Sequence, residues 1–131
     1  MSLFIDSISN AFSVQGKSVK IPHTGMTKEV ATSIMAKNPG KVPVVIIRQD
    51  DRIKLKKSKF LVPCDLTMGQ LVYVIRRHSD EVQSSEALFV FISKKSVLAP
   101  TSSTLGSLYD MYEEDGFLKI EVHLENTFGA N

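Results

Sequence analysis

Residues 59–77, KFLVPCDLTMGQLVYVIRR, carry the clearest structural pattern in the sequence. The first five of them, Lys59 to Pro63, are largely apolar and end at a proline, which predicts a strand. Thr67 and Gln70 have the spacing of a capping box, the pair of side chains that starts a helix. Apolar residues then mark one helical face as far as His78, and these are Met68, Leu71, Val72 and Ile75. The stretch therefore predicts a strand that leads through a short turn into an amphipathic helix.

A second strand is predicted just upstream, at VPVVIIR, residues Val42 to Arg48. It is bounded by Asp50 and Asp51 and lies at hairpin distance from Lys59, so we expect the two strands to pair antiparallel. Both alternate sets of its side chains are apolar, Val42, Val44 and Ile46 on one face and Pro43, Val45 and Ile47 on the other. The strand must therefore be covered on both faces.

The N-terminal part predicts two helices. Phe4, Ile8 and Phe12 recur at helical spacing before breaks at residues 15–17 and 22–25, which predicts a short helix followed by irregular chain. Met26, Val30 and Ile34 repeat every four residues, with Thr24 or Thr27 available as a cap and Asn38-Pro39-Gly40 as a stop. This is the second helix.

The C-terminal part predicts a strand, a helix and a final strand. LFVFI, residues 88–92, reads as a buried strand, and Thr104 caps a helix that carries Leu105, Leu108 and Tyr112 on one face. In FLKIEVHL, residues 117–124, the core-facing set is Leu118, Ile120, Val122 and Leu124. Phe117 falls on the polar side, so we expect either an N-terminal helix or a partner to cover it. The order is ββαβαβ after two helices, an α+β fold.

Composition fits one globular domain. The chain has 131 residues and a net charge of +2, and no apolar run approaches the roughly 20 residues that span a bilayer. Its start lacks the basic segment of a secretory signal, and a single cysteine, Cys64, cannot form an intramolecular disulfide. A reducing compartment, by default the cytosol, is predicted.

Positive charge gathers in one short stretch, which contains Arg48, Arg52, Lys54, Lys56, Lys57 and Lys59. Lysines on an edge strand can simply block unwanted pairing, or the stretch can recruit acidic peptides or lipid headgroups. No interleaved aromatic residues suggest stacked bases, so nucleic acid is not an expected partner.

We find no catalytic or metal-binding pattern in the sequence. His23, His78 and His123 are far apart and lack partners at ligand spacing, and Cys64 has no evident acid–base partner. No glycine-rich nucleotide-binding motif is present. We therefore expect no enzymatic activity, no metal and no cofactor.

Several motifs together resemble one known family. KNPGKVPVVI, KFLVPCDLTMGQLVYVIRR, EALFVFI, APTSSTLGSLYDMYEEDGFLKI and the terminal TFG are similar, in this order, to the ubiquitin-like autophagy modifiers. That family comprises autophagy-related protein eight, the microtubule-associated light chains and the GABA-receptor-associated proteins. The resemblance implies a ubiquitin-like β-grasp with a four-stranded mixed sheet and two additional N-terminal helices. It also implies an appendage at 1–25, the domain proper at 26–129 and a removable propeptide at 130–131.

The resemblance implies a fate for the C-terminus. A cysteine protease would cut between Gly129 and Ala130, after the aromatic-glycine pair Phe128-Gly129. Activating and conjugating enzymes would then pass Gly129 to phosphatidylethanolamine, so the protein is a substrate and the lipid its only expected covalent group. It would be cytoplasmic, and on autophagosomal or vacuolar-type membranes when lipidated. The alternatives are a non-conjugated β-grasp interaction module and a sibling modifier joined to a protein lysine.

The resemblance also implies docking of cargo-receptor peptides with an aromatic residue, two spacers and an aliphatic residue. Such a peptide would add a strand at the basic edge formed by Lys57 and Lys59. The family's aromatic pocket corresponds to Ile34, Pro43, Val45, Lys59, Leu61 and Phe117. Its aliphatic pocket corresponds to Phe60, Val62, Pro63, Leu66, Leu71 and Val74. The acidic residue that family members usually carry four positions before Ile34 is Val30 in this chain.

Overall fold

A computed structural model describes residues 13–14, 17–18, 27–53, 55, 58–79, 81–83, 85–93 and 95–125. Its elements follow the order β1 (Ser13–Val14), β2 (Lys17–Ser18), α2 (Lys28–Lys37), β3 (Lys41–Gln49), β4 (Lys59–Pro63), α3 (Met68–Arg77), β5 (Leu88–Ile92), β6 (Val97–Leu98), α4 (Leu105–Tyr112) and β7 (Leu118–Leu124). Each strand and helix predicted between residues 26 and 124 is present at close to its predicted bounds.

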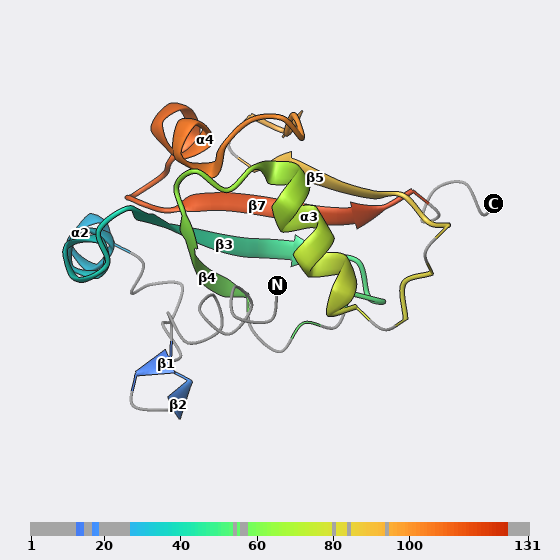
Figure 1. Ribbon diagram of the computed structural model, residues 1–131, viewed down its shortest axis with the longest axis horizontal. Helices are drawn as coiled ribbons and strands as arrows, with labels where there is room; N and C mark the ends of the chain where they lie inside the picture. The colour runs from blue at the N-terminus through green and yellow to red at the C-terminus, as the bar shows by residue number, and fades with distance from the viewer. Residues whose placement is uncertain are drawn as a thin grey trace.

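Five strands form one mixed sheet in the order β4-β3-β7-β5-β6 (Figure 1). β3 and β7 are parallel, and the other neighbours are antiparallel, including the predicted β3–β4 hairpin. The α+β class is confirmed, but the predicted count of four strands is wrong, because β6 adds a fifth at the edge beside β5. β6 has only two residues, both exposed, which is too short to show the alternation that identifies a strand in a sequence.

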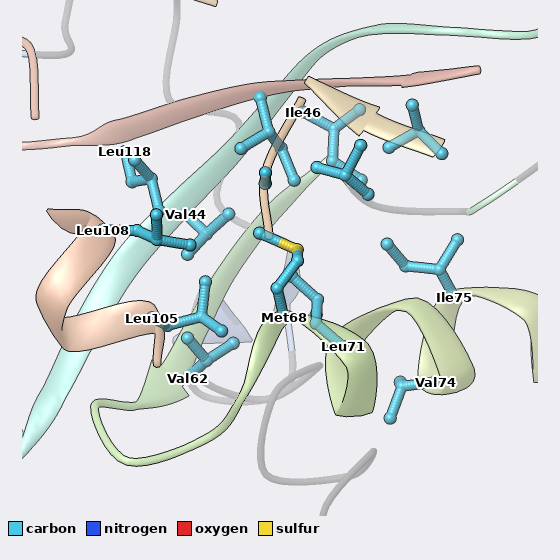
Figure 2. Close-up of a cluster of buried hydrophobic side chains, with 14 of the residues drawn as sticks. Val44, Ile46, Val62, Met68, Leu71, Val74, Ile75, Leu105, Leu108 and Leu118 are labelled. Atoms are coloured by element: carbon cyan, nitrogen blue, oxygen red, sulfur yellow. The ribbon is translucent and has the colours of Figure 1, made fainter. Parts of the chain in front are cut away.

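The main core lies between one face of the sheet and helices α3 and α4. Figure 1 shows α3 lying across the sheet, and Figure 2 shows the side chains that meet there. Val44, Ile46, Val62 and Leu118 come from strands, Met68, Leu71, Val74 and Ile75 from α3, and Leu105 and Leu108 from α4. Burying these apolar side chains is the main favourable term in folding.

The opposite face of the sheet holds a smaller cluster against α2. Its buried members are Ala31, Val45 and Phe117, with Val30 and Ile34 packed beside them. The prediction that β3 is covered on both faces is confirmed as far as Ile46, since Val42, Val44 and Ile46 enter the main core and Val45 enters this cluster. Beyond it the cover ends, because Ile47 is 38% exposed. Phe117 is covered by an N-terminal helix, α2, as its position on the polar side of the last strand suggested.

Local signals in the sequence set the helix ends. Thr67 Oγ1 accepts from Gln70 N and Gln70 Oε1 accepts from Thr67 N, which confirms the capping box. Thr27 caps α2, and Thr104 caps α4. These caps satisfy backbone N–H groups that would otherwise lack partners at a helix start. None of the helices in the described residues is long and apolar enough to cross a membrane.

The N-terminal segment differs from its prediction. The first predicted helix, with Phe4, Ile8 and Phe12, lies outside the described residues. Where irregular chain was predicted, β1 and β2 pair antiparallel with Val14 opposite Lys17. A glycine-containing connection of two residues is typical of a hairpin, but strands of two residues carry no detectable alternation.

Candidate peptide-docking site

β4 forms one edge of the five-stranded sheet. Ile46 N donates to Ser58 O at 2.7 Å, and Cys64 N donates to Gly40 O at 2.9 Å. Because hydrogen-bonded pairs alternate along an antiparallel ladder, the even-numbered residues of β4 bond to β3. The backbone N–H and C=O groups of Lys59 and Leu61 therefore point away from β3, toward the side on which the sheet has no further strand among the described residues.

The proline of each strand fits this ladder. Pro63 is an odd-numbered residue of β4, so its missing N–H falls on the outer side and removes no bond to β3. Pro43 lies opposite Leu61 and is likewise outside the hydrogen-bonded pairs of this ladder. An added strand would find the N–H and C=O groups of Lys59 and Leu61, because Pro63 has no N–H and its C=O already accepts from Leu66 N at 3.1 Å.

The two predicted pocket sets lie on opposite faces of the sheet. Lys59 and Leu61 pair with Val45 and Pro43 across the ladder, on the face covered by α2. Phe60 and Val62 pair with Val44 and Val42, on the face covered by α3 and α4. Partners across a ladder project to the same face, so β4 divides the two sets.

Each set is brought together by tertiary packing. Val45 and Phe117 share one cluster with Ile34, and Leu61 and Pro43 lie on the same face. Phe60, Val62, Leu66, Leu71 and Val74 all belong to or pack against the main core. Pro63 is the exception, because strand alternation puts it on the side of Lys59 and Leu61.

Most of these residues are fully buried. In the aromatic set Val45, Leu61 and Phe117 are 0% exposed, and only Ile34 and Lys59 reach the surface in part. In the aliphatic set Phe60 and Pro63 are partly exposed, while the other four are buried. The site therefore consists of a buried floor on each face and an exposed rim of four side chains, Ile34, Lys59, Phe60 and Pro63.

Two residues join the aromatic set that the sequence did not indicate. Ala31 is 1% exposed and packs with Val45 and Phe117, and Val30 packs beside it. Val30 replaces a residue that is acidic in the family's usual pattern, so this part of α2 contributes an aliphatic side chain to the cluster. Their role depends on how α2 is set against the sheet, which periodicity alone does not give.

The side chains of the basic stretch differ in their exposure and in their ion pairs. Arg52 Nη1 lies 2.6 Å from Glu86 Oε2, and Arg52 Nε lies 3.7 Å from Asp50 Oδ1. This ion pair ties the turn after β3 to the segment before β5, so Arg52 is already engaged. Arg48 is exposed and Lys59 partly exposed, whereas Lys54, Lys56 and Lys57 lie outside the described residues.

Other site types are poorly supported. The described residues hold no group of three or more His, Cys, Asp or Glu side chains that could bind a metal ion. A cavity of about 390 Å³ is lined by Phe91, Ser96, Glu121 and His123, where His123 Nε2 lies 3.1 Å from Glu121 Oε1. One imidazole and one carboxylate are too few for a structural metal site.

β7 ends beside the start of β5, its antiparallel neighbour. Glu125 N donates to Ala87 O at 2.9 Å, next to the start of β5. The predicted processing and conjugation residues, Phe128 and Gly129, lie outside the described residues.

Comparison with known proteins identifies the family. A family model described as "Autophagy protein Atg8 ubiquitin like" matches residues 26–129 of the chain. The chain belongs to the Atg8 family. This confirms the resemblance seen in the motifs, and the ubiquitin-like fold with it.

Individual members agree with this assignment. The chain is 36% identical to Autophagy-related protein 8 of Dictyostelium discoideum over 107 residues, 79% of this chain and 86% of that protein. It is 41% identical to Autophagy-related protein 8b of Arabidopsis thaliana over 104 residues, 77% of this chain and 83% of that protein. The crystal structure of Trypanosoma brucei ATG8 superposes with a TM-score of 0.68 at 32% identity, covering 78% of this chain and 88% of that one.

A further Atg8 structure is a complex. Plasmodium falciparum Atg8 bound to a Plasmodium falciparum Atg3 peptide is similar to this chain with a TM-score of 0.60 at 25% identity, covering 72% of this chain and 85% of that one. An Atg8 of this fold thus binds a peptide.

Proposed function

We propose that this Atg8-family chain is a ubiquitin-like modifier that is cut after Gly129 and conjugated to phosphatidylethanolamine on autophagosomal membranes. The observation that carries the proposal is the family match, which extends to residue 129 and leaves Ala130 and Asn131 beyond it. On this proposal residues 26–129 act as the modifier, residues 1–25 are an appendage and residues 130–131 are removed.

In the proposed cleavage and conjugation reactions the chain is the substrate. A cysteine protease hydrolyses the peptide bond between Gly129 and Ala130, which frees the Gly129 carboxylate. An activating enzyme converts this carboxylate to an acyl adenylate with ATP, releasing pyrophosphate, and a cysteine thiol then displaces AMP. The resulting thioester passes by exchange to the cysteine of a conjugating enzyme. The lipid amine attacks the thioester carbonyl, an amide bond forms and the thiol leaves. Glycine suits each step, because it has no side chain to clash in a narrow active site.

The second part of the proposal is docking of aromatic-x-x-aliphatic peptides at β4. The outward backbone groups of Lys59 and Leu61 support it, since they can pair with an added strand. The peptide's two anchors would then enter on opposite faces, the aromatic one at Ile34 and Lys59 and the aliphatic one at Phe60, while Pro63 projects to the face of Lys59. Because the floors are buried, these rim side chains must move aside on binding.

Partners follow from the same surface. The Plasmodium falciparum complex contains an Atg3 peptide, and we infer that a segment of a conjugating enzyme docks on this chain in a similar way. Cargo receptors with an aromatic-x-x-aliphatic motif are the second class. Lys59, with Lys57, would attract the acidic residues that flank such motifs.

Intact mass spectrometry of the protein recovered from cells tests the conjugation. The expected result is loss of Ala130 and Asn131 with a phosphatidylethanolamine adduct on Gly129. In a Gly129→Ala variant the adduct should be absent. An intact C-terminus during active autophagy would refute the proposal.

A second candidate function is a docking module without conjugation, or a modifier joined to a protein lysine. The β4 edge favours the docking module, because its geometry is independent of the C-terminal residues. An uncut tail together with peptide binding would support the docking module. A mass shift equal to a second protein, instead of a lipid, would support the lysine-linked modifier.

A further inference from the structure

The turn before Phe117 is held by a network centred on Tyr109 of α4. Tyr109 Oη donates to the Gly116 carbonyl at 2.7 Å and lies 3.3 Å from Met35 Sδ. One hydroxyl therefore contacts both the turn that leads into β7 and helix α2. Its contact with Met35 is a polar contact between α4 and α2.

The turn itself is held by several hydrogen bonds. Glu114 and Phe117 exchange two backbone hydrogen bonds of 2.7 and 3.0 Å, and the two residues between them, Asp115 and Gly116, have φ of 54° and 86°. Positive φ at both central positions defines a type I′ turn, for which Asp-Gly is a favoured pair. Gly116 N also donates to Glu113 Oε1 at 2.8 Å. Every polar backbone group of Gly116 is thus engaged.

This turn determines where two parts of the aromatic set lie. Phe117 follows directly and is 0% exposed against α2. A Cβ at Gly116 would overlap the Cβ of Ala31, so α2 rests on the turn backbone itself. The Tyr109 hydroxyl fixes the Gly116 carbonyl on one side of this contact and touches Met35 on the other.

We propose that Tyr109 is a positioning residue for the aromatic side of the docking site. By joining the Gly116 turn to α2 it sets the spacing between Phe117 and the helix that carries Ile34, without touching the peptide. The inference rests on the docking function proposed above. Tyr109 and Met35 also pack against the main core that holds the aliphatic residues, but the hydroxyl itself bonds to Gly116, next to Phe117. The role assigned to the hydroxyl therefore concerns the aromatic side.

The hydroxyl is protonated under ordinary conditions, as this role requires. Burial raises the pKa of Tyr109, and the nearby carboxylates of Glu113 and Asp110 raise it further. A phenol that ionises above its usual range of about 10 keeps its proton, and its donor function, at neutral pH.

The test removes one oxygen atom. Tyr109→Phe keeps the ring and loses the hydroxyl, and Tyr73→Phe makes the same change on α3 at a side chain that is 46% exposed. The full-length variants are titrated with three acidic peptides that carry Phe-x-x-Leu, Ala-x-x-Leu or Phe-x-x-Ala. Isothermal titration gives each Kd, and circular dichroism confirms that each variant is folded.

We expect Tyr109→Phe to weaken binding of Phe-x-x-Leu and Phe-x-x-Ala by about three- to tenfold, the factor that one neutral hydrogen bond contributes to an equilibrium. Binding of Ala-x-x-Leu should be unchanged, and Tyr73→Phe should change none of the three. Equal weakening of all three peptides by Tyr109→Phe would show a general structural role and overturn the inference. So would no weakening at all.

A second variant and a hydrogen-exchange measurement test the role of Tyr109 independently. Met35→Leu removes only the sulfur contact, so it should give a smaller loss that is again confined to the Phe peptides, and it serves if Tyr109→Phe does not fold. Amide hydrogen exchange in α2, measured without peptide, should be faster in Tyr109→Phe than in the unaltered chain. If the unaltered chain binds no peptide, the docking proposal fails. Unchanged exchange in α2 would overturn the positioning role separately.

Discussion

Gly116 offers the sharpest test of how α2 is seated. Replacing it with alanine should destabilise the folded state in two ways, through the backbone conformation and through a steric overlap. Its φ of 86° lies in the left-handed region, where a side chain costs about 1–2 kcal/mol. The new Cβ would also overlap that of Ala31, and overpacking of this kind costs typically about 1–3 kcal/mol. Gly116→Ala should therefore lower the free energy of unfolding by roughly 2–5 kcal/mol, a large share of the ~5–15 kcal/mol typical of a domain.

The chain provides a matched control. Gly40 has a similar φ of 79°, but a Cβ built there meets nothing within 4 Å. Gly40→Ala should lower the free energy of unfolding only through the strained backbone conformation, by about 1–2 kcal/mol. Urea unfolding followed by far-ultraviolet circular dichroism gives both values, provided that the slope with denaturant is unchanged.

The difference between the two variants measures the packing of α2 on the turn. Ala31→Gly in the Gly116→Ala background should recover part of the loss, because it removes the atom that clashes. If Gly116→Ala and Gly40→Ala destabilise the protein equally, then α2 does not rest on Gly116 and the reasoning is refuted.

Two further predictions concern charge. Lys59→Glu on β4 should weaken binding of an acidic-flanked peptide by roughly two- to tenfold at low salt, and by less at higher salt, because salt screens the interaction. Lys95→Glu in the β5–β6 turn is the control. An equal loss of affinity in both variants would mean that only the net charge of the protein matters. The pKa of Tyr109 is raised in the folded state, so the stability it contributes is complete below pH 10, its unfolded value, and is lost as pH rises through the folded pKa. The urea midpoint should thus fall more steeply above pH 10 in the unaltered chain than in Tyr109→Phe, and parallel curves would contradict the shift.

The docking residues and the core are largely the same side chains. Leu61, Val62 and Phe117 are 0% exposed, so truncating any of them would open a cavity as well as alter a pocket, at a cost of several kcal/mol. Peptide binding is better tested at the rim, at Ile34 and Lys59 on one face and Phe60 on the other. For the docking proposed above, this overlap would provide a preorganised floor, which lowers the conformational cost of binding.

The amino-acid sequence was enough to predict the family and every helix and strand between residues 26 and 124 except β6. Local signals act over a few residues, as the capping box at Thr67 and Gln70 and the alternation in β7 do. They are therefore visible without knowing the fold. The family motifs also named the two pocket sets, and the structure brings nearly all their described members together on two faces at β4.

How these elements pack against one another could not be read from the sequence. The strand β6 forms because β5 offers it an edge, and its two residues carry no period that could predict it. The burial of the pocket floors and the placement of Pro63 depend on the sheet register. The contact of Tyr109 with Gly116 and Met35 joins residues separated by 7 and 74 positions. Such contacts form where separate elements pack, so no local pattern in the sequence could predict them.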